Sequence, residues 1–252
     1  MSAAKIERYP ITIDGETVQI GTANELAAAL DVLQGQHDRV ALTQLRPHLA
    51  EIIAHARGLM AVMKALAPDD QVFLIEALGA GLAGVMQDAT RLRDQLATLA
   101  ESRVEEALLR TLGAAGMQQL ILTADELAEV LEWVYGECDW LALELLGFDT
   151  VRALCRQAHD LSAILHNLDG ERQDRLMEKL GWPFMVSLVR DGRDLAYLLR
   201  ALPPASSELL LGHFTGPELA ALTSNPRDRE YLYQRLEPEE ARLLDKLLGA
   251  GK

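Results

Sequence analysis

The sequence predicts an all-α protein, a right-handed α-solenoid of about six 34-residue repeats preceded by a small N-terminal β-hairpin. Three features recur at this period: a Leu-Gly dipeptide or a close variant, the apolar positions, and the helix-breaking residues. We call the positions that the period aligns a column. The Leu-Gly column comprises Leu78-Gly79, Leu112-Gly113, Leu146-Gly147, Leu180-Gly181, Phe214-Thr215 and Leu248-Gly249.

The N-terminal segment, residues 1–21, predicts the hairpin. Residues 9–20 alternate apolar and polar side chains around Asp14-Gly15, a strong signal for a tight turn between two strands. An isolated hairpin is marginally stable in water, so we expect it to dock on the first helices and to cap the open end of the array. A degenerate leading repeat follows it, at Leu26, Leu30, Leu33, Leu42 and Leu45.

Residues 22–249 form the predicted helical array, with repeats ending near residues 45, 79, 113, 147, 181, 215 and 249. A column of helix breakers separates the middle helix of each repeat from the last one: Pro68, Ser102, Gly136, Gly170, Pro204 and Pro238. The glycine of the Leu-Gly column is expected to close the last helix in a left-handed conformation.

The first and middle helices have a weaker boundary. Thr123-Ala-Asp-Glu126 reads as a full capping box and Asn225-Pro-Arg-Asp228 as a helix N-terminus, so a break is expected at both places. Elsewhere the sequence leaves open whether these two helices are continuous. Each repeat therefore has two to three short helices.

The amino-acid composition limits the classes of protein to which the chain can belong. The chain has 252 residues, of which 49% are apolar and 5% aromatic, enough for a large aliphatic core. No apolar stretch approaches the roughly 20 residues that cross a bilayer, and the N-terminus lacks the apolar run of a signal peptide. We expect a cytoplasmic protein, with secretion by a specialised system left open. Cys155 is expected to be a small buried residue, and neither it nor Cys138 indicates a zinc or redox motif.

The formal charge of −14 argues against general nucleic-acid binding, which needs a basic surface. The distribution of charge is uneven. Residues 114–147 contain seven acids and no base, so half of the excess charge lies in one central repeat.

Two tryptophans in that repeat depart from their columns. Trp140 stands in a column that otherwise reads Val72, Glu106, Asp174, Glu208 and Arg242, and Trp133 in one that otherwise reads Ala65, Leu99, Asn167, Ala201 and Arg235. An exposed ring surrounded by carboxylates has the composition of a binding hot spot for a basic partner. The alternative is that the rings fill a gap against a neighbouring repeat or contact a second copy of the chain, as in a homodimer. The residues of this predicted partner-binding site are Trp133, Tyr135, Trp140, Glu129, Glu132, Glu137 and Asp139.

Another column is mostly basic, with Asp125 as its one acidic member. The column after it carries Glu126, Asp160, Asp194 and Asp228, whose carboxylates are well placed to accept backbone N–H groups at the start of the middle helix. The basic residues then either pair with acids of the adjacent repeat or form an anion-binding edge. The residues of this edge are Arg57, Arg91, His159, Arg193 and Arg227.

Catalytic motifs are missing from the sequence. The six histidines fit no metal-binding spacing, and the glycines between Gly79 and Gly84 follow a helix rather than a strand, which favours close packing over nucleotide binding. We therefore expect no enzymatic activity, no cofactor and no metal.

The unit Trp182-Pro-Phe-Met-Val-Ser-Leu-Val-Arg-Asp-Gly-Arg-Asp-Leu-Ala-Tyr-Leu-Leu-Arg-Ala-Leu-Pro-Pro204 resembles helical repeat arrays in secreted effectors of intracellular bacteria. The resemblance covers roughly residues 45–249 and implies an architecture, but no site residue. The period is also that of tetratricopeptide repeats and of the DNA-reading repeats of plant-pathogen effectors, and the chain matches neither signature.

These features together predict a protein-protein interaction module, such as a bacterial adaptor, effector or immunity-type binder. Its partner is expected to be basic and to contact the acidic, aromatic central repeat. The alternative function is binding of an extended polyanion or nucleic acid along the arginine column, although nucleic acid and membrane are unlikely partners for a chain of this charge.

Overall fold

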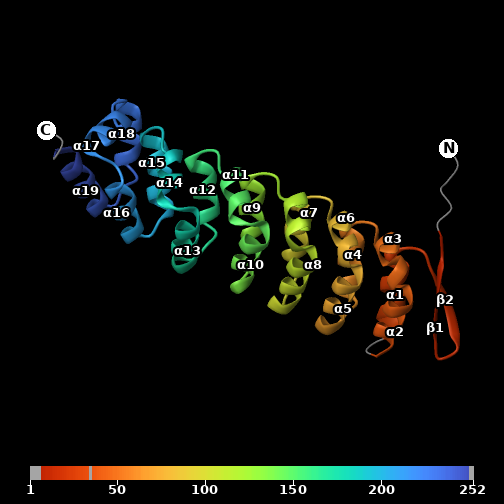
Figure 1. Cartoon of the computed structure of the whole chain (residues 1–252). Coiled ribbons are helices and arrows are strands. Elements are labelled where there is room, and N and C mark those ends of the chain that lie inside the picture. The colour runs from red at the N-terminus through yellow and green to blue at the C-terminus, as the bar shows by residue number, and fades with distance from the viewer. Residues whose placement is uncertain (1–6, 34–35, 250–252) are drawn as a thin grey trace, which may run out of the picture. The chain divides into compact units, whose positions relative to one another are not determined.

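A computed structural model describes residues 7–33 and 36–249 as a helical protein with a two-stranded hairpin at its N-terminal end (Figure 1). The chain divides into two compact units. Unit 1 consists of Met1–Ile121 and Trp133–Leu146, and unit 2 of Leu122–Glu132 and Gly147–Lys252. None of the helices in the described part of the chain is long and apolar enough to cross a membrane.

The hairpin has the turn that its sequence predicts. Strands β1 (Tyr9–Ile13) and β2 (Glu16–Ile20) pair antiparallel. Asp14 and Gly15 both have positive φ, 52° and 86°, as a tight primed turn requires. The hairpin docks on α2 (Gln36–Leu45), where the Gln44 amide exchanges two hydrogen bonds with the backbone of Thr12, of 2.8 and 2.9 Å. The prediction that it rests on the first helices is confirmed.

Unit 1 also contains most of the N-terminal helices. Their bounds are α1 (Ala23–Leu33), α3 (Leu49–Ile53), α4 (Ala56–Lys64), α5 (Pro68–Leu78), α6 (Leu82–Met86), α7 (Ala89–Leu96), α8 (Ser102–Leu120) and α10 (Glu137–Leu146), with short 3₁₀ turns η1 (Arg46–His48) and η2 (Gly79–Gly81). Two series pack in succession: α1, α4 and α7, and α2, α5, α8 and α10 (Figure 1).

Unit 2 contains α9 (Ala124–Leu131), α11 (Phe148–Leu154), α12 (Ala158–Leu165), α13 (Gly170–Leu180), α14 (Trp182–Leu188), α15 (Gly192–Ala201), α16 (Pro204–Gly212), α17 (Gly216–Leu222), α18 (Pro226–Tyr233) and α19 (Pro238–Gly249). Helices α9, α12, α15 and α18 pack in succession, and their first residues are separated by a constant 34 residues. Residues one period apart in this series therefore occupy neighbouring places.

Helix boundaries follow the breaker columns. The last helix of each period begins at or next to the expected Pro, Ser or Gly, as at Pro68, Ser102 and Gly170. The first and middle helices are separate in every period from α3 and α4 onward, so the two-helix alternative is wrong within the described residues. Helix α8 spans a different junction, that between a last helix and the next first helix, and Gly113 kinks it there with a φ of 58° and a ψ of −173°.

Local hydrogen bonds explain why the middle helices are separate. Each of five begins after a residue whose side chain accepts a backbone N–H of the first turn: His55, Asp88, Thr123, Asp191 and Asn225. Carboxylates reach back in return, since Glu126 accepts from the N–H of Thr123 at 3.0 Å and Asp194 from that of Arg190 at 3.0 Å. The predicted capping role of the acidic column is confirmed for these residues.

The glycines of the Leu-Gly column adopt the left-handed conformation expected of them at four positions. Their φ values are 50° at Gly79, 58° at Gly113, 87° at Gly147 and 83° at Gly181. A side chain rarely adopts this conformation, so three of these glycines mark the end of a last helix and Gly113 marks the kink in α8.

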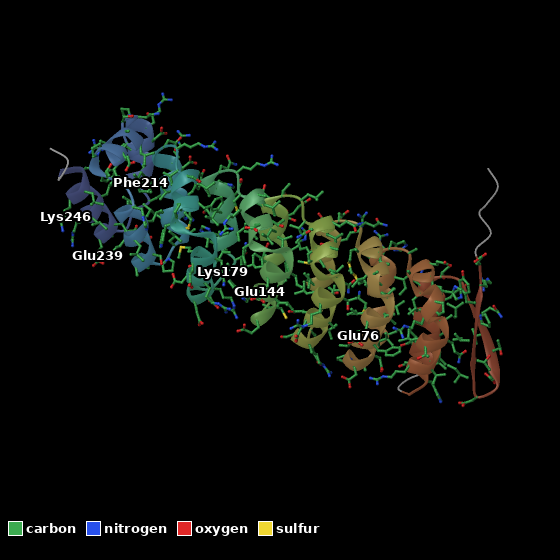
Figure 2. All side chains as sticks on the ribbon, viewed as in Figure 1. Glu76, Glu144, Lys179, Phe214, Glu239 and Lys246 are labelled. Carbon is green, nitrogen blue, oxygen red and sulfur yellow. The ribbon has the colours of Figure 1, made fainter. Side chains whose placement is uncertain are left out.

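Two glutamines of one column, one in each unit, make the same hydrogen bonds within their own unit. The side-chain amide of Gln71 donates to the carbonyls of Met63 and Leu66, and that of Gln173, 102 residues later, donates to Leu165 and Leu168. These carbonyls end the preceding middle helix in each unit, and 102 residues are three periods. Exposed positions likewise recur, since Glu76 and Glu144, two periods apart, are both exposed (Figure 2).

Candidate functional site

Trp140 does not lie on the surface. Its side chain on α10 is only 4% exposed, and its indole N–H donates to the Glu144 carboxylate at 2.7 Å. The charged residues of the same column are exposed, but burial of an indole removes a large apolar area from water, so the ring turns inward. The expectation of a solvent-facing ring is therefore wrong for Trp140, which is buried. Asp139 is buried as well, so the prediction that its carboxylate belongs to a partner-binding surface is also wrong.

Three other residues of the predicted site do reach the surface of unit 1. Tyr135 lies in the loop before α10 and is 55% exposed, Trp133 is half-buried, and Glu137 is exposed at the first residue of α10. The backbone N–H of Tyr135 donates to the Glu105 carboxylate at 3.4 Å, which holds the loop on α8. We call Trp133, Tyr135 and Glu137 the Tyr135 surface.

The remaining two acids of the predicted site belong to unit 2. Glu129 on α9 and Glu132 at its C-terminal end are both exposed. The predicted set therefore divides into a buried part, two exposed acids in unit 2, and Trp133, Tyr135 and Glu137 in unit 1.

A buried ionisable group lies next to Tyr135. Glu105 is 2% exposed, Cys138 and Asp139 are also buried, and the Cys138 thiol donates to the carbonyl of Ser102 at 3.6 Å. Burial raises the pKa of Glu105 above its usual range. Burial, helped by the charges of Glu105, Glu106 and Asp139, raises the pKa of Cys138 to about 11. The raised pKa favours the protonated thiol at neutral pH over the nucleophilic thiolate.

Glu105 was not among the residues selected from the sequence, although a signal for it exists. It stands in the column of Gln71 and Gln173, which also contains Asp139 and Ser207, so the column is polar through five periods. Polar residues that recur at a fixed place between apolar neighbours indicate a buried hydrogen-bonding role. The acidic members of this column both lie in unit 1.

The basic column is exposed along its length but is not a continuous ladder of ion pairs. Arg193 on α15 pairs with Asp228 on α18, with 2.7 Å between Nε and Oδ1, which confirms the predicted pairing with an adjacent repeat at this step. Arg91 instead pairs with Asp88 of its own helix start. Within residues 7–33 and 36–249, no ion pair is formed by Arg57 or Arg227.

Aromatic rings accompany this column in unit 2. The His159 ring meets Tyr197 edge-on at 5.0 Å, and Tyr197 lies 6.0 Å from Tyr231. The Arg235 guanidinium covers the Tyr231 ring at 3.4 Å from its centroid, and that of Arg193 is 5.7 Å away. Sequence reasoning missed these tyrosines, although Tyr197 and Tyr231 are one period apart. We call this set the arginine–tyrosine surface: His159, Arg193, Tyr197, Arg227, Tyr231 and Arg235.

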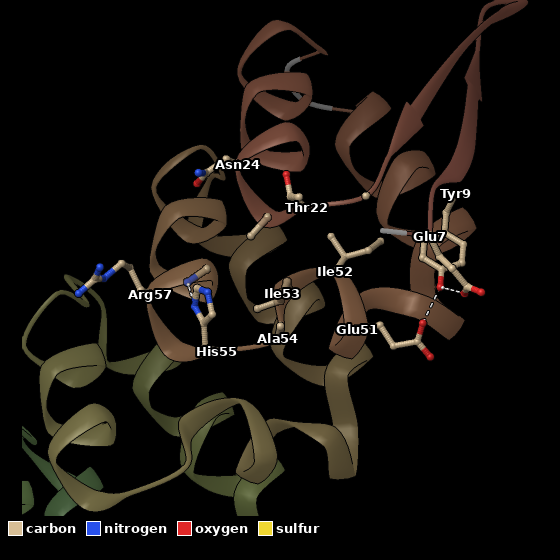
Figure 3. Close-up of a pocket in the computed structure, with 13 residues that line it drawn as sticks. Glu7, Tyr9, Thr22, Asn24, Glu51, Ile52, Ile53, Ala54, His55 and Arg57 are labelled. Carbon is tan, nitrogen blue, oxygen red and sulfur yellow. Dashed lines mark hydrogen bonds between the residues drawn. The ribbon is translucent and has the colours of Figure 1, made fainter. Parts of the chain in front are cut away.

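A hollow of about 650 Å³ lies between the hairpin and helices α1, α3 and α4 in unit 1 (Figure 3). On one side the Tyr9 hydroxyl lies 2.5 Å from Glu51 Oε2 and 2.9 Å from Glu7 Oε2. The Tyr9 ring stacks on His48 at 3.8 Å. Hydrogen bonds to the two carboxylates raise the pKa of Tyr9, so its hydroxyl acts as a donor that anchors the hairpin.

Neither a search for groups of metal ligands nor a comparison with known proteins adds a further site. Within the described part of the chain, no three His, Cys, Asp or Glu side chains are grouped as a metal ion requires. No family model, no curated protein and no solved structure matches this chain. Functional inference therefore rests on the chain's own residues.

Proposed function

We propose that the protein is a non-enzymatic binding scaffold, a right-handed solenoid of about six repeats that recognises a basic protein partner. The repeat organisation is supported by Gln71 and Gln173, which make the same pair of hydrogen bonds three periods apart. An adaptor, an effector or an immunity-type binder of bacterial origin is the kind of protein that uses such an array.

The exposure of Tyr135 is the observation that carries the proposal. This ring is 55% exposed in a protein that buries most of its large apolar side chains, and it lies beside half-buried Trp133. Tyrosine and tryptophan are enriched among the residues that dominate binding energy at interfaces. The loop that carries Tyr135 is held by Glu105, so the ring is presented without a large ordering cost on binding.

The negative charge around Tyr135 predicts that the partner is positively charged. Glu137 lies next to Tyr135 in the sequence region of seven acids and no base, and exposed Glu129 and Glu132 belong to the same region. An electrostatic field of one sign speeds encounter with a partner of the opposite sign and disfavours partners of like charge. A lysine- or arginine-rich protein surface is therefore the proposed ligand.

The test compares wild type with two variants of the full chain for binding to a fluorescein-labelled arginine-rich peptide and for capture of proteins from host lysate. Tyr135→Ala combined with Glu137→Gln is expected to weaken peptide binding at least about tenfold and to remove the basic proteins captured by wild type. Val32→Ala is the matched control, because Val32 is 81% exposed in the same unit and lies on α1.

Two results would contradict the proposal. Unchanged peptide affinity in the double variant would show that the Tyr135 surface is not the binding site. Capture of acidic proteins alone, by wild type and both variants, would show that the proposed chemistry of the partner is wrong.

A further inference from the structure

Unit 2 presents a surface of opposite character to the Tyr135 surface. The arginine–tyrosine surface extends over three consecutive middle helices, α12, α15 and α18, which pack in succession. Its rings are linked by contacts: His159 with Tyr197, Tyr197 with Tyr231, and Tyr231 with two guanidinium groups. The surface is thus continuous from one helix to the next.

Acids and bases are equal in number between Arg190 and Arg235, and Asp228 pairs with Arg193, but two other acids are engaged by backbone N–H groups. Asp191 accepts the backbone N–H groups of Arg193 and Asp194, at 2.8 and 3.0 Å. Asp194 accepts the N–H of Arg190. Their charge is directed toward helix N-termini, where it is balanced by the helix dipole, while the arginine side chains extend into solvent.

The basic groups themselves are available for a ligand. Arg193 is bound to Asp228 through Nε, so its terminal amino groups remain for a second carboxylate, and its side chain is 53% exposed. Arg227 and His159 are exposed in the neighbouring helices. The pairing with Asp228 fixes the direction of the Arg193 guanidinium, which lowers the entropy lost when it binds.

We propose that the arginine–tyrosine surface binds an extended acidic polypeptide segment in which carboxylates alternate with apolar or aromatic side chains. Arg193, Arg227 and His159 would receive the carboxylates. The half-buried rings of Tyr197 and Tyr231 would receive the apolar residues between them. This surface and its ligand are independent of the Tyr135 surface.

Charge favours an acidic polypeptide over a nucleic acid. The chain's net charge of −14 repels a phosphate backbone, whose charge density far exceeds that of an acidic peptide.

The experiment measures fluorescence anisotropy of a labelled peptide of alternating glutamate and phenylalanine on the full chain. Arg193→Gln and Arg227→Gln are each expected to weaken binding about threefold and together about tenfold, as solvent-exposed charge pairs do. Arg200→Gln is the matched control, since Arg200 is an exposed arginine of the same helix α15 outside the surface, and its affinity should equal that of wild type. A peptide with serine in place of phenylalanine should bind more weakly than the original.

Arg227→Gln keeps the test valid if Arg193→Gln unfolds the protein, because the side chain of Arg227 forms no ion pair among the described residues. Equal affinity of wild type and Arg227→Gln would overturn the proposal. Tighter binding of a labelled oligothymidylate than of the peptide would do the same and would assign the surface to nucleic acid. So would sedimentation showing a dimer of wild type that Arg227→Gln separates, since the occupant would then be a second copy of the chain.

Discussion

Units 1 and 2 use the same helical framework to present opposite chemistry. The framework is shared down to single hydrogen bonds, as Gln71 in unit 1 and Gln173 in unit 2 show. The surfaces differ, because unit 1 exposes Tyr135 among acids, whereas unit 2 has half-buried Tyr197 and Tyr231, the second of which is covered by Arg235. The comparison teaches that the columns which hold helices together are restricted in chemistry, and that the surface columns are free to diverge.

The two units also differ beneath their surfaces. The polar column that contains Gln173 and Ser207 in unit 2 contains Glu105 and Asp139 in unit 1. Ser207 still donates to a middle-helix carbonyl, that of Leu199 at 3.2 Å, whereas Glu105 accepts the N–H of Tyr135. Gln71 in unit 1 is a donor to a middle helix like Gln173 and Ser207, whereas Glu105 is an acceptor that positions the exposed loop.

The largest expected effect on stability is the difference between a buried and an exposed aromatic residue of unit 1. Trp140→Ala should lower the free energy of unfolding by about 3–5 kcal/mol, because it leaves a cavity where a buried indole was packed. Tyr135→Ala should change it by less than about 0.5 kcal/mol, as exposed substitutions do. Urea denaturation followed by circular dichroism measures both. Similar stability of the two variants would remove the distinction between the packed ring and the presented ring.

The left-handed glycines offer a comparison of the framework between units. Gly113→Ala in unit 1 and Gly181→Ala in unit 2 should each cost about 1–2 kcal/mol, because alanine is strained at φ of 58° and 83°. Gly84→Ala, in the interior of α6 with open space around the added methyl group, should instead stabilise by up to about 1 kcal/mol. Thermal denaturation of the three variants checks the signs. Unequal costs at Gly113 and Gly181 would show that the framework is not equivalent in the two units.

Substitutions that exchange Glu and Gln at two positions of the polar column test whether this column has different roles in the two units. Gln173→Glu should destabilise unit 2 by about 1–2 kcal/mol at neutral pH, since a carboxylate would face the carbonyls of Leu165 and Leu168 without a proton to donate. Glu105→Gln should stabilise unit 1 by about 1 kcal/mol, because it removes a buried charge and supplies an amide. Opposite signs are the expected result in chemical denaturation, and equal signs would contradict the assigned roles.

The Glu105 substitution also predicts a pH dependence. Burial raises the pKa of Glu105 above its ordinary value of 4.5, so the folded state binds a proton more tightly than the unfolded state does. The stability that this group contributes is present below pH 4.5 and is lost as the pH rises through the raised pKa. The advantage of Glu105→Gln over wild type should therefore grow from about pH 4 to about pH 7. A constant difference over this range would show that Glu105 titrates normally.

The smallest effect concerns the cysteines, one in each unit. Burial raises the pKa of Cys138 to about 11 and that of Cys155 to about 12, so neither thiol forms a thiolate at neutral pH. Both should react with a disulfide reagent only after unfolding, with no change in stability on Cys155→Ser larger than about 1 kcal/mol. Rapid labelling of native protein at Cys138 alone would show that unit 1 is open around Tyr135.

Local features of the fold were predictable from the sequence. The turn at Asp14-Gly15, the capping box at Thr123 and the breaks at Pro68 and Gly170 each depend on a few neighbouring residues, so their chemistry is legible in the chain. The burial of Cys155 followed from its apolar column.

Features that depend on contacts between periods were not predictable. Trp140 was expected at the surface because its column is charged, but its own size decides that it turns inward. The contact between Tyr197 and Tyr231 depends on how α15 packs on α18, and the sequence of either helix alone does not determine that packing. The division of the acidic region between two compact units likewise arises from packing rather than from composition.

The reciprocal cap at the start of α9 makes this helix start locally self-sufficient. Thr123 and Glu126 satisfy each other's backbone groups within four residues, so these polar groups need no partner from the rest of the chain. The first turn of α9 can therefore keep its hydrogen bonds when the packing around it changes.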